Sequence, residues 1–145
     1  LAVAGRFVGD HAIRTFAAER EGVTFTEPHE VIEFADGDEI EHAGIRFVVD
    51  HTPGHTQGSV VLRTVATTPD GSAVPVALTG DTLFEGSIGR TDLPGGNHEQ
   101  LLASIATKVL VLDDATNILP GHGRSSTIGR ERASNPFLTG LAGSR

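Results

Sequence analysis

Cysteine and methionine are both absent from this chain of 145 residues. Without cysteine, the chain can form neither a disulfide framework nor a thiolate metal site. This absence fits a reducing compartment, and the N-terminus shows no secretory signal pattern, so we expect a cytoplasmic protein. Because the chain begins with Leu1 and contains no methionine, we expect Leu1 not to be the start of the translated product.

Long apolar runs and basic side chains are also scarce. No apolar run approaches the roughly 18 residues that a membrane-spanning helix needs. The chain has 11 Lys and Arg residues against 19 Asp and Glu residues, a net charge of −8. Phosphate binding needs a basic surface, so we expect neither nucleic acid nor an anionic membrane as a partner. The hydrophobic content of 38% and the charged content of 21% are typical of one soluble globular domain.

The order of apolar residues and turn residues predicts short strands mixed with helices. Strands are expected at residues 31–34, 39–42, 45–49, 59–63, 74–78 and 117–119. Helices are expected at 10–21, 98–108 and 127–134, and a glycine-rich loop at 85–97. This mixture favours a layered α+β or α/β fold over a simple array of βαβ units.

Three polar side chains, His55, Asp81 and His122, each follow a predicted strand and have a glycine neighbour. Glycine permits unusual backbone angles and close approach by other groups. Taken singly, each residue could be a cap, a turn residue or a solvated group. Taken together, imidazole and carboxylate groups at strand ends suit zinc, manganese or iron. Asp81 could bridge two ions with one histidine on each, and water between such ions is strongly acidified.

The same residues carry a family resemblance. Three segments resemble the later metal motifs of the metallo-β-lactamase superfamily: HTPGHTQGS at 51–59, LTGDTLF at 78–84 and LPGHG at 119–123. Further segments are similar to the single-domain bacterial branch of the glyoxalase II-like hydrolases: GRTDLPGG at 89–96, STIGRER at 126–132 and NPFL at 135–138. The resemblance covers about residues 30 to 140.

This resemblance implies an αββα sandwich with a site for two divalent metals, zinc first, with iron or manganese as alternatives. His55 would bind the first metal, Asp81 would bridge and act as the catalytic carboxylate, and His122 would bind the second metal. The implied reaction is attack of a metal-activated hydroxide on a small-molecule thioester such as S-lactoylglutathione, with a thiolate as the leaving group.

One family motif, His-x-His-x-Asp-His, is missing from the chain. By comparison with the family, residues 1–145 are therefore expected to be the C-terminal portion of one domain. Three ligands with one shared carboxylate give each ion two donors, whereas zinc normally takes four. We therefore expect weak or no metal binding, and no activity, from this portion alone. We also expect an exposed sheet edge or core face that pairs with an N-terminal half or with a second copy.

Three further residues lie close to these motifs. His51 is expected to orient a ligand or support the loop rather than to bind metal itself. Arg90 and Asp92 are expected to form an ion pair that shapes the loop beside the site, and Arg90 could contact substrate.

Three alternatives to the thioester hydrolase stay open. The first is an iron-dependent persulfide dioxygenase, in which His122 would not be a primary ligand. The second is a β-lactamase, against which the GRTD loop and the NPFL segment argue. The third is an inactive half-domain, for which the missing motif is the main support. Reading the coding sequence upstream of Leu1 would separate the third from the others.

Overall fold

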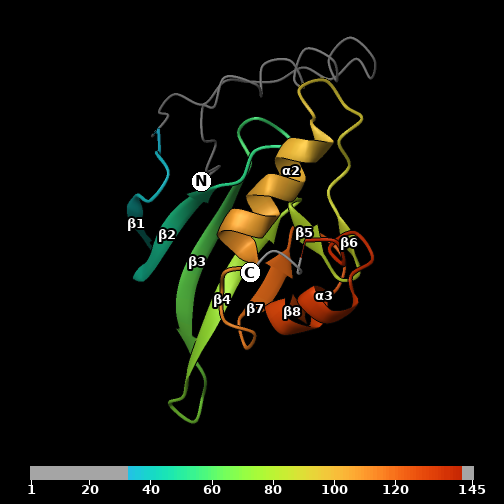
Figure 1. The fold of residues 1–145 in the computed structure, drawn as a ribbon. Helices are drawn as coiled ribbons and strands as arrows, with labels where there is room; N and C mark the ends of the chain where they lie inside the picture. Colours follow the sequence, from blue (N-terminus) through green and yellow to red (C-terminus); the bar gives the residue numbers. More distant parts are fainter. Residues whose placement is uncertain (1–32, 142–145) are drawn as a thin grey trace.

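The computed structural model describes residues 33–141 (Figure 1). Its main feature is a six-stranded sheet in the order β1-β2-β3-β4-β7-β8. The strands are β1 (Glu39–His42), β2 (Ile45–His51), β3 (Val60–Thr67), β4 (Ala73–Gly80), β7 (Asn117–Pro120) and β8 (Ser126–Thr127). Every neighbouring pair is antiparallel except β4 and β7, which are parallel.

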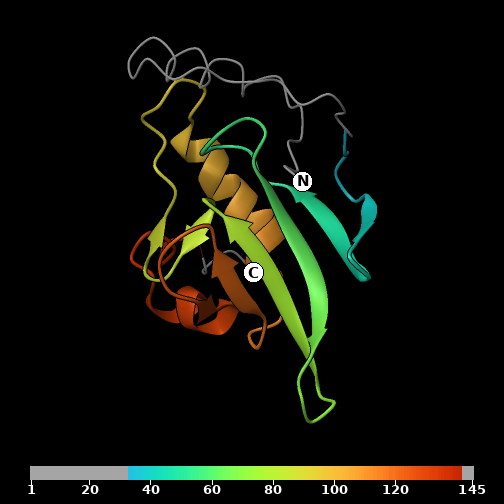
Figure 2. The ribbon, with the colours of Figure 1, turned by 180° about the vertical axis from the view of Figure 1, so that it is seen from behind.

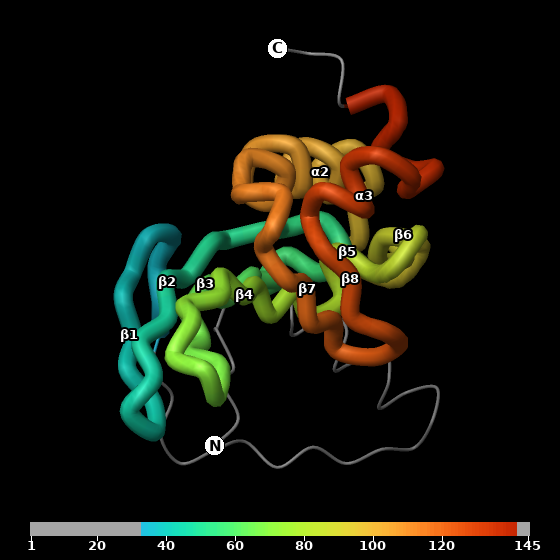
Figure 3. Tube along the Cα trace, turned by 90° about the horizontal axis from the view of Figure 1, so that it is seen from below, coloured from blue at the N-terminus to red at the C-terminus, as the bar shows by residue number. Residues whose placement is uncertain are grey.

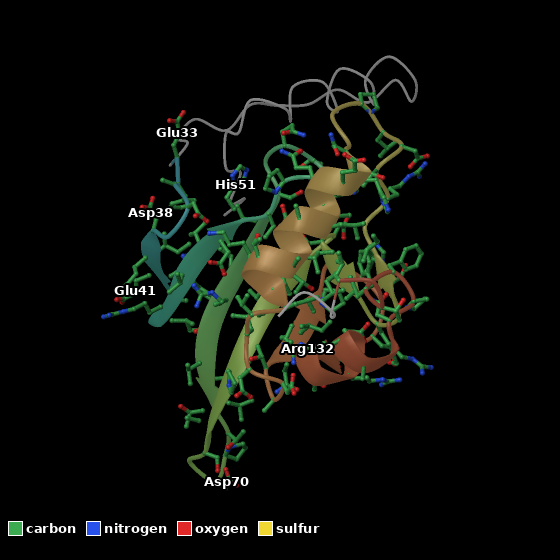
Figure 4. The ribbon with its side chains drawn as sticks, in the orientation of Figure 1. Glu33, Asp38, Glu41, His51, Asp70 and Arg132 are labelled. Carbon is green, nitrogen blue, oxygen red and sulfur yellow. The ribbon has the colours of Figure 1, made fainter. Side chains whose placement is uncertain are left out.

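One hairpin connects β1 to β2 and another connects β3 to β4, while a loop joins β2 to β3. Ala43 and Gly44, with φ angles of 52° and 77°, form the turn between β1 and β2. Left-handed angles at both positions match the twist that a two-residue hairpin requires. The longer β3–β4 hairpin carries Asp70 at its tip, far from the helices (Figure 4).

The strands predicted from 39 to 119 are confirmed, several with extra residues at one end. Of the strand predicted at 31–34, the described residues Glu33 and Phe34 are not in a strand, which corrects that prediction. The predicted helix at 10–21 lies outside the described residues. The predicted loop at 85–97 is also partly wrong. Strand β5 (Leu83–Phe84) pairs there with β6 (Ser87–Ile88) in a small separate hairpin.

Both helices predicted within the described residues are present. Helix α2 (His98–Ser104) continues into a π-helical turn, η1 (Ile105–Val109), and α3 (Ile128–Ser134) follows β8. Asn97 caps α2 by accepting a hydrogen bond from the amide of Gln100 at 2.9 Å. Asn135 ends α3 immediately before Pro136, because proline disfavours a helical residue in front of it.

Both helices lie on the same face of the sheet (Figure 3). Between them and the strands lies the core, built from fully buried residues that include Val61, Ala77, Leu101, Ile105, Ile118 and Ile128. Each large apolar side chain buried there contributes about 1.5–3 kcal/mol. No helix in the described range covers the opposite face of β3, β4 and β7 (Figure 2), and Leu119, which points away from the core, is 43% exposed.

The sheet and its one-sided helices confirm the predicted α+β class. The parallel β4–β7 pair sets the location of the site, because it places the ends of two non-consecutive strands side by side. Between residues 33 and 141, no helix has both the length and the apolar character needed to cross a membrane.

Candidate metal centre

Loops at the ends of three strands bring His55, Asp81 and His122 together. His55 lies in the loop after β2, while Asp81 and His122 lie just beyond the neighbouring ends of β4 and β7. Nε2 of His55 is 3.6 Å from Oδ2 of Asp81, and Nε2 of His122 is 3.5 Å from Oδ1 of the same carboxylate. Each oxygen of Asp81 therefore faces one imidazole.

Two glycines allow this close packing. A Cβ atom on Gly121 would lie 2.8 Å from Oδ1 of Asp81, and one on Gly89 would lie 2.0 Å from the carbonyl oxygen of Asp81. The amide of Gly121 also donates to the carbonyl of Gly80 at 2.8 Å, which links the ends of β4 and β7. Glycine is required at both positions because of the contact itself rather than because of the φ angle.

A main-chain hydrogen bond fixes the orientation of His55. Nδ1 of His55 lies 2.8 Å from the carbonyl oxygen of Arg90. A carbonyl oxygen can only accept, so Nδ1 carries the proton and, in the neutral ring, Nε2 presents its lone pair towards Asp81. The side chain is only 17% exposed. This is the arrangement by which proteins orient a metal-binding imidazole.

His122 is held differently. Its side chain is 74% exposed, and its ring stacks on Phe84 with 4.5 Å between centroids and 27° between planes. A stacked aromatic pair restricts ring rotation through surface contact rather than through a hydrogen bond. No role was predicted for Phe84 from the sequence. Its position as the last residue of the LTGDTLF segment was the only signal that could have pointed to it.

Hydrogen bonds of buried threonines support the loops that carry His55 and Asp81. Thr52 and Thr82 have their hydroxyl oxygens 3.2 Å apart, and Thr79 donates to the carbonyl of Leu83 at 2.8 Å. All three threonines are at most 1% exposed. Sequence reasoning missed them as well, although each lies within three residues of His55 or Asp81.

The remaining predicted residues surround this centre. Nε2 of His51 lies 2.8 Å from the carbonyl of Gln57, across the loop that carries His55, and His51 does not line the cavity described below. Arg90 and Asp92 form the predicted ion pair through two hydrogen bonds of 2.7 and 2.8 Å. The Arg90 guanidinium lowers the pKa of Asp92 to about 2, and Asp92 raises the pKa of Arg90 above its ordinary value.

A cavity of about 570 Å³ opens over the centre and is lined by His55, Asp81 and His122. Phe84 and Ile88 give it an apolar side, while Arg90 and Arg124 add positive charge to its wall. Its size is that of a pocket for a small molecule.

The distances between the ligands test whether metal ions fit. Two ligands on one tetrahedral ion, each at about 2.1 Å, lie about 3.4 Å apart. The two N···O separations of 3.5 and 3.6 Å match this value, one on each side of Asp81. Within residues 33–141, no group of three or more His, Cys, Asp or Glu side chains could hold one ion together. Each imidazole–carboxylate pair therefore has the spacing of two ligands on one ion.

Comparison with known proteins assigns the family. A family model described as "Metallo-beta-lactamase superfamily" matches residues 3–122. The chain belongs to this superfamily. An uncharacterized Mycobacterium tuberculosis protein is 56% identical over 122 residues, which are 83% of this chain and 54% of that protein. Hydroxyacylglutathione hydrolase GloC of Haemophilus influenzae is 45% identical over 103 residues, or 71% of this chain and 45% of GloC.

Solved structures of the superfamily agree with this assignment. The B3 metallo-beta-lactamase BLEG-1 has a TM-score of 0.70 at 39% identity and covers 86% of this chain and 56% of its own. TTHA1623, in a di-iron-bound form, has a TM-score of 0.67 at 36% identity. The match covers 88% of this chain and 59% of TTHA1623. The resemblance read from the motifs and the predicted partial superfamily fold are both confirmed. The chain spans about half the length of the curated Mycobacterium relatives that it matches.

Proposed function

We propose that this chain carries part of the active site of a metal-dependent thioester hydrolase of the glyoxalase II type. The observation that carries the proposal is the placement of one imidazole Nε2 at 3.5–3.6 Å from each oxygen of Asp81. The 45% identity to a hydroxyacylglutathione hydrolase supports the substrate class, because that relative is named for cleaving a thioester of glutathione.

In this proposal His55, Asp81 and His122 would hold two divalent ions, with one imidazole facing each oxygen of Asp81. Zinc is the first choice, and iron or manganese is the alternative, since a di-iron form is known for TTHA1623. When bound, such ions supply Lewis acidity at the centre of the cavity. The described residues would offer each ion only two donors.

The cavity supplies the other requirements of the reaction. The apolar side formed by Phe84 and Ile88 suits the hydrocarbon part of the acyl group. Arg90 and Arg124 attract the negative charge of a thiol conjugate. Hydrolysis adds water to the carbonyl carbon and breaks the carbon–sulfur bond, which releases a hydroxy acid and a free thiol. Asp81 serves both halves of the centre, so we assign it the catalytic carboxylate role.

The test measures thiol release from S-lactoylglutathione by the complete gene product that contains Leu1 to Arg145, loaded with zinc. These 145 residues hold no cysteine, so they add no thiol background to the assay. Asp81→Asn is expected to abolish thiol release. Asp70→Asn, the same change at the tip of the β3–β4 hairpin, is expected to leave it unchanged. A metal-loaded protein that releases no thiol, or a fully active Asp81→Asn variant, would contradict the proposal.

The similarity to BLEG-1 makes β-lactam hydrolysis the second candidate. The same preparations are therefore assayed with a chromogenic β-lactam. Ring opening without thioester cleavage would replace the proposal. A persulfide dioxygenase would instead consume oxygen with a thiol persulfide, hold a single iron, and retain activity in His122→Ala.

A further inference from the structure

A buried carboxylate lies outside the candidate metal centre, on α3. Glu131 is 1% exposed, and no basic side chain among the described residues forms an ion pair with it. Hydrogen bonds alone satisfy its oxygens. Oε1 accepts from the hydroxyl of Ser126 at 2.5 Å, and Oε2 accepts from the amide of Gly86 and the side-chain amide of Asn135, each at 2.8 Å. Burial of a charged group is costly, so these contacts require an explanation.

The hydrogen bonds of Glu131 and Asn135 lead to the small β5–β6 hairpin. Gly86 lies in its turn, and the side chain of Asn135 also donates to the carbonyl of Ser87 at 3.1 Å. A hairpin with two residues in each strand is far too short to be stable alone. Its position is therefore determined by what it docks against. Glu131 of α3 contacts Gly86 in the turn, the C-cap Asn135 contacts Ser87 on β6, and Arg130 of α3 pairs with Glu85 at 2.9 Å.

This hairpin controls the environment of both histidines. Phe84, on β5, is the ring on which His122 stacks. Arg90, two residues beyond β6, provides the carbonyl that accepts the hydrogen bond from His55. A shift of the hairpin would therefore change the support of His55 and His122 at the same time, although Glu131 does not line the cavity.

We infer that Glu131 is a positioning residue for His55 and His122 and acts through the β5–β6 hairpin. The inference rests on the proposed function only for the use of the two histidines. Whether they are positioned in this way can be measured without metal or substrate.

The experiment records imidazole nitrogen–proton correlation spectra of the complete gene product and its variants, without metal. Glu131→Ala removes the acceptors for Gly86 and Asn135. The upfield ring-current shift that Phe84 imposes on the carbon-bound protons of His122 is then expected to be lost. His55 is expected to change from the single Nδ1–H form to a mixture of tautomers.

The Glu131→Gln variant tests whether the hydrogen bonds of Glu131 or its negative charge matter. In Glu131→Gln the amide oxygen can still accept from Gly86 and Asn135, while its NH₂ group donates to the Ser126 hydroxyl. We expect this variant to restore both histidine signals. With zinc and S-lactoylglutathione, Glu131→Ala is expected to lower kcat/KM by about 10–100-fold, the usual effect of losing a group that supports a ligand. Glu131→Gln is expected to stay near the parent value.

A matched control lies at the next position of the same helix. Arg132 donates to the carbonyls of Leu110 and Leu112 and pairs with Asp114, on the side of α3 away from the hairpin (Figure 4). Arg132→Ala is expected to lower the melting temperature without changing the two histidine signals. If Glu131→Ala does not fold, Asn135→Ala, which cuts the link to Ser87, is expected to change the same signals. Unchanged signals in a folded Glu131→Ala or Asn135→Ala variant, or equal changes in Arg132→Ala, would overturn the inference.

Discussion

His55 and His122 face the two oxygens of one carboxylate, yet the protein holds them by different means. His55 is mostly buried, and a main-chain carbonyl fixes its tautomer. His122 is mostly exposed, and an aromatic ring restrains it by stacking. One side of the centre is therefore set by hydrogen-bond geometry and the other by surface contact. A change in one supporting side chain should perturb one side alone, whereas Asp81 and the β5–β6 hairpin serve both sides.

Removing the shared carboxylate should have the largest effect. In the complete gene product, we expect Asp81→Asn to weaken zinc binding by more than about 100-fold, because losing a group that merely supports a ligand already costs about 10–100-fold. Competition against a chromophoric chelator measures this affinity. Asp38→Asn, the same change at an exposed position before β1, provides the control. A loss of less than tenfold in Asp81→Asn would show that the two histidines bind without it.

The next largest effect is expected from Gly89→Ala, which crowds the side of the centre that holds His55. In Gly89→Ala the new Cβ would lie 2.0 Å from the main-chain oxygen of Asp81 and 3.2 Å from Cβ of His55. We expect a loss of about 3 kcal/mol in the free energy of unfolding, measured by urea denaturation, because the backbone must move.

The control for that variant is Gly71→Ala. Gly71 has a φ of +87° and open space around it, so alanine there should cost only the left-handed backbone, about 1 kcal/mol. Equal costs at the two positions would show that the packing at Gly89 can relax.

A smaller effect is expected from Phe84→Leu, which removes the ring that supports His122. Phe84→Leu keeps an apolar side chain but removes the stacked ring, a loss of about 0.5–1.5 kcal/mol of pair interaction. We expect weaker zinc binding and altered His122 signals, while the His55 Nδ1–H signal stays as it is. Imidazole spectra of the variant and the parent provide the measurement. A change in the His55 signal as large as that at His122 would mean that the two sides are not independent.

The smallest effect is expected from Arg90→Ala. His55 bonds to the carbonyl of Arg90 and not to its side chain, so its tautomer should be unchanged. The pKa of Asp92 should rise from about 2 towards its ordinary value of 3.8. A lowered pKa means that the ion pair stabilises the folded state above pH 4 and that this contribution is lost as the pH falls through about 2. Carboxyl NMR titration of both proteins measures the two midpoints.

Sequence reasoning predicted the parts of the molecule that depend on local pattern. Alternating apolar residues predict β2, and the apolar run before Gly80 predicts the central strand β4. The turn at Ala43 and Gly44 and the stop of α3 before Pro136 follow from residue type alone. The three candidate ligands could be named because each follows such a strand.

The supports of the candidate ligands could not be predicted in the same way. Strands β5 and β6 are too short to show any period, so β5 was not predicted as a strand and β6 fell within the predicted loop. The stack of Phe84 on His122 and the hydrogen bond that Gly86 donates to Glu131 join residues far apart in the chain. A glutamate on a short helix reads as a solvated residue until the hairpin covers it.

The parallel pairing of β4 with β7 has a consequence for how the molecule folds. The two strands become neighbours only after the long crossover through β5, β6 and α2 has closed, and closure of such a loop costs entropy before any contact offsets it. Asp81 and His122 therefore have no local route to one another during folding. A substitution that raises the cost of closing that crossover would therefore delay their meeting, even if it leaves the finished cavity unchanged.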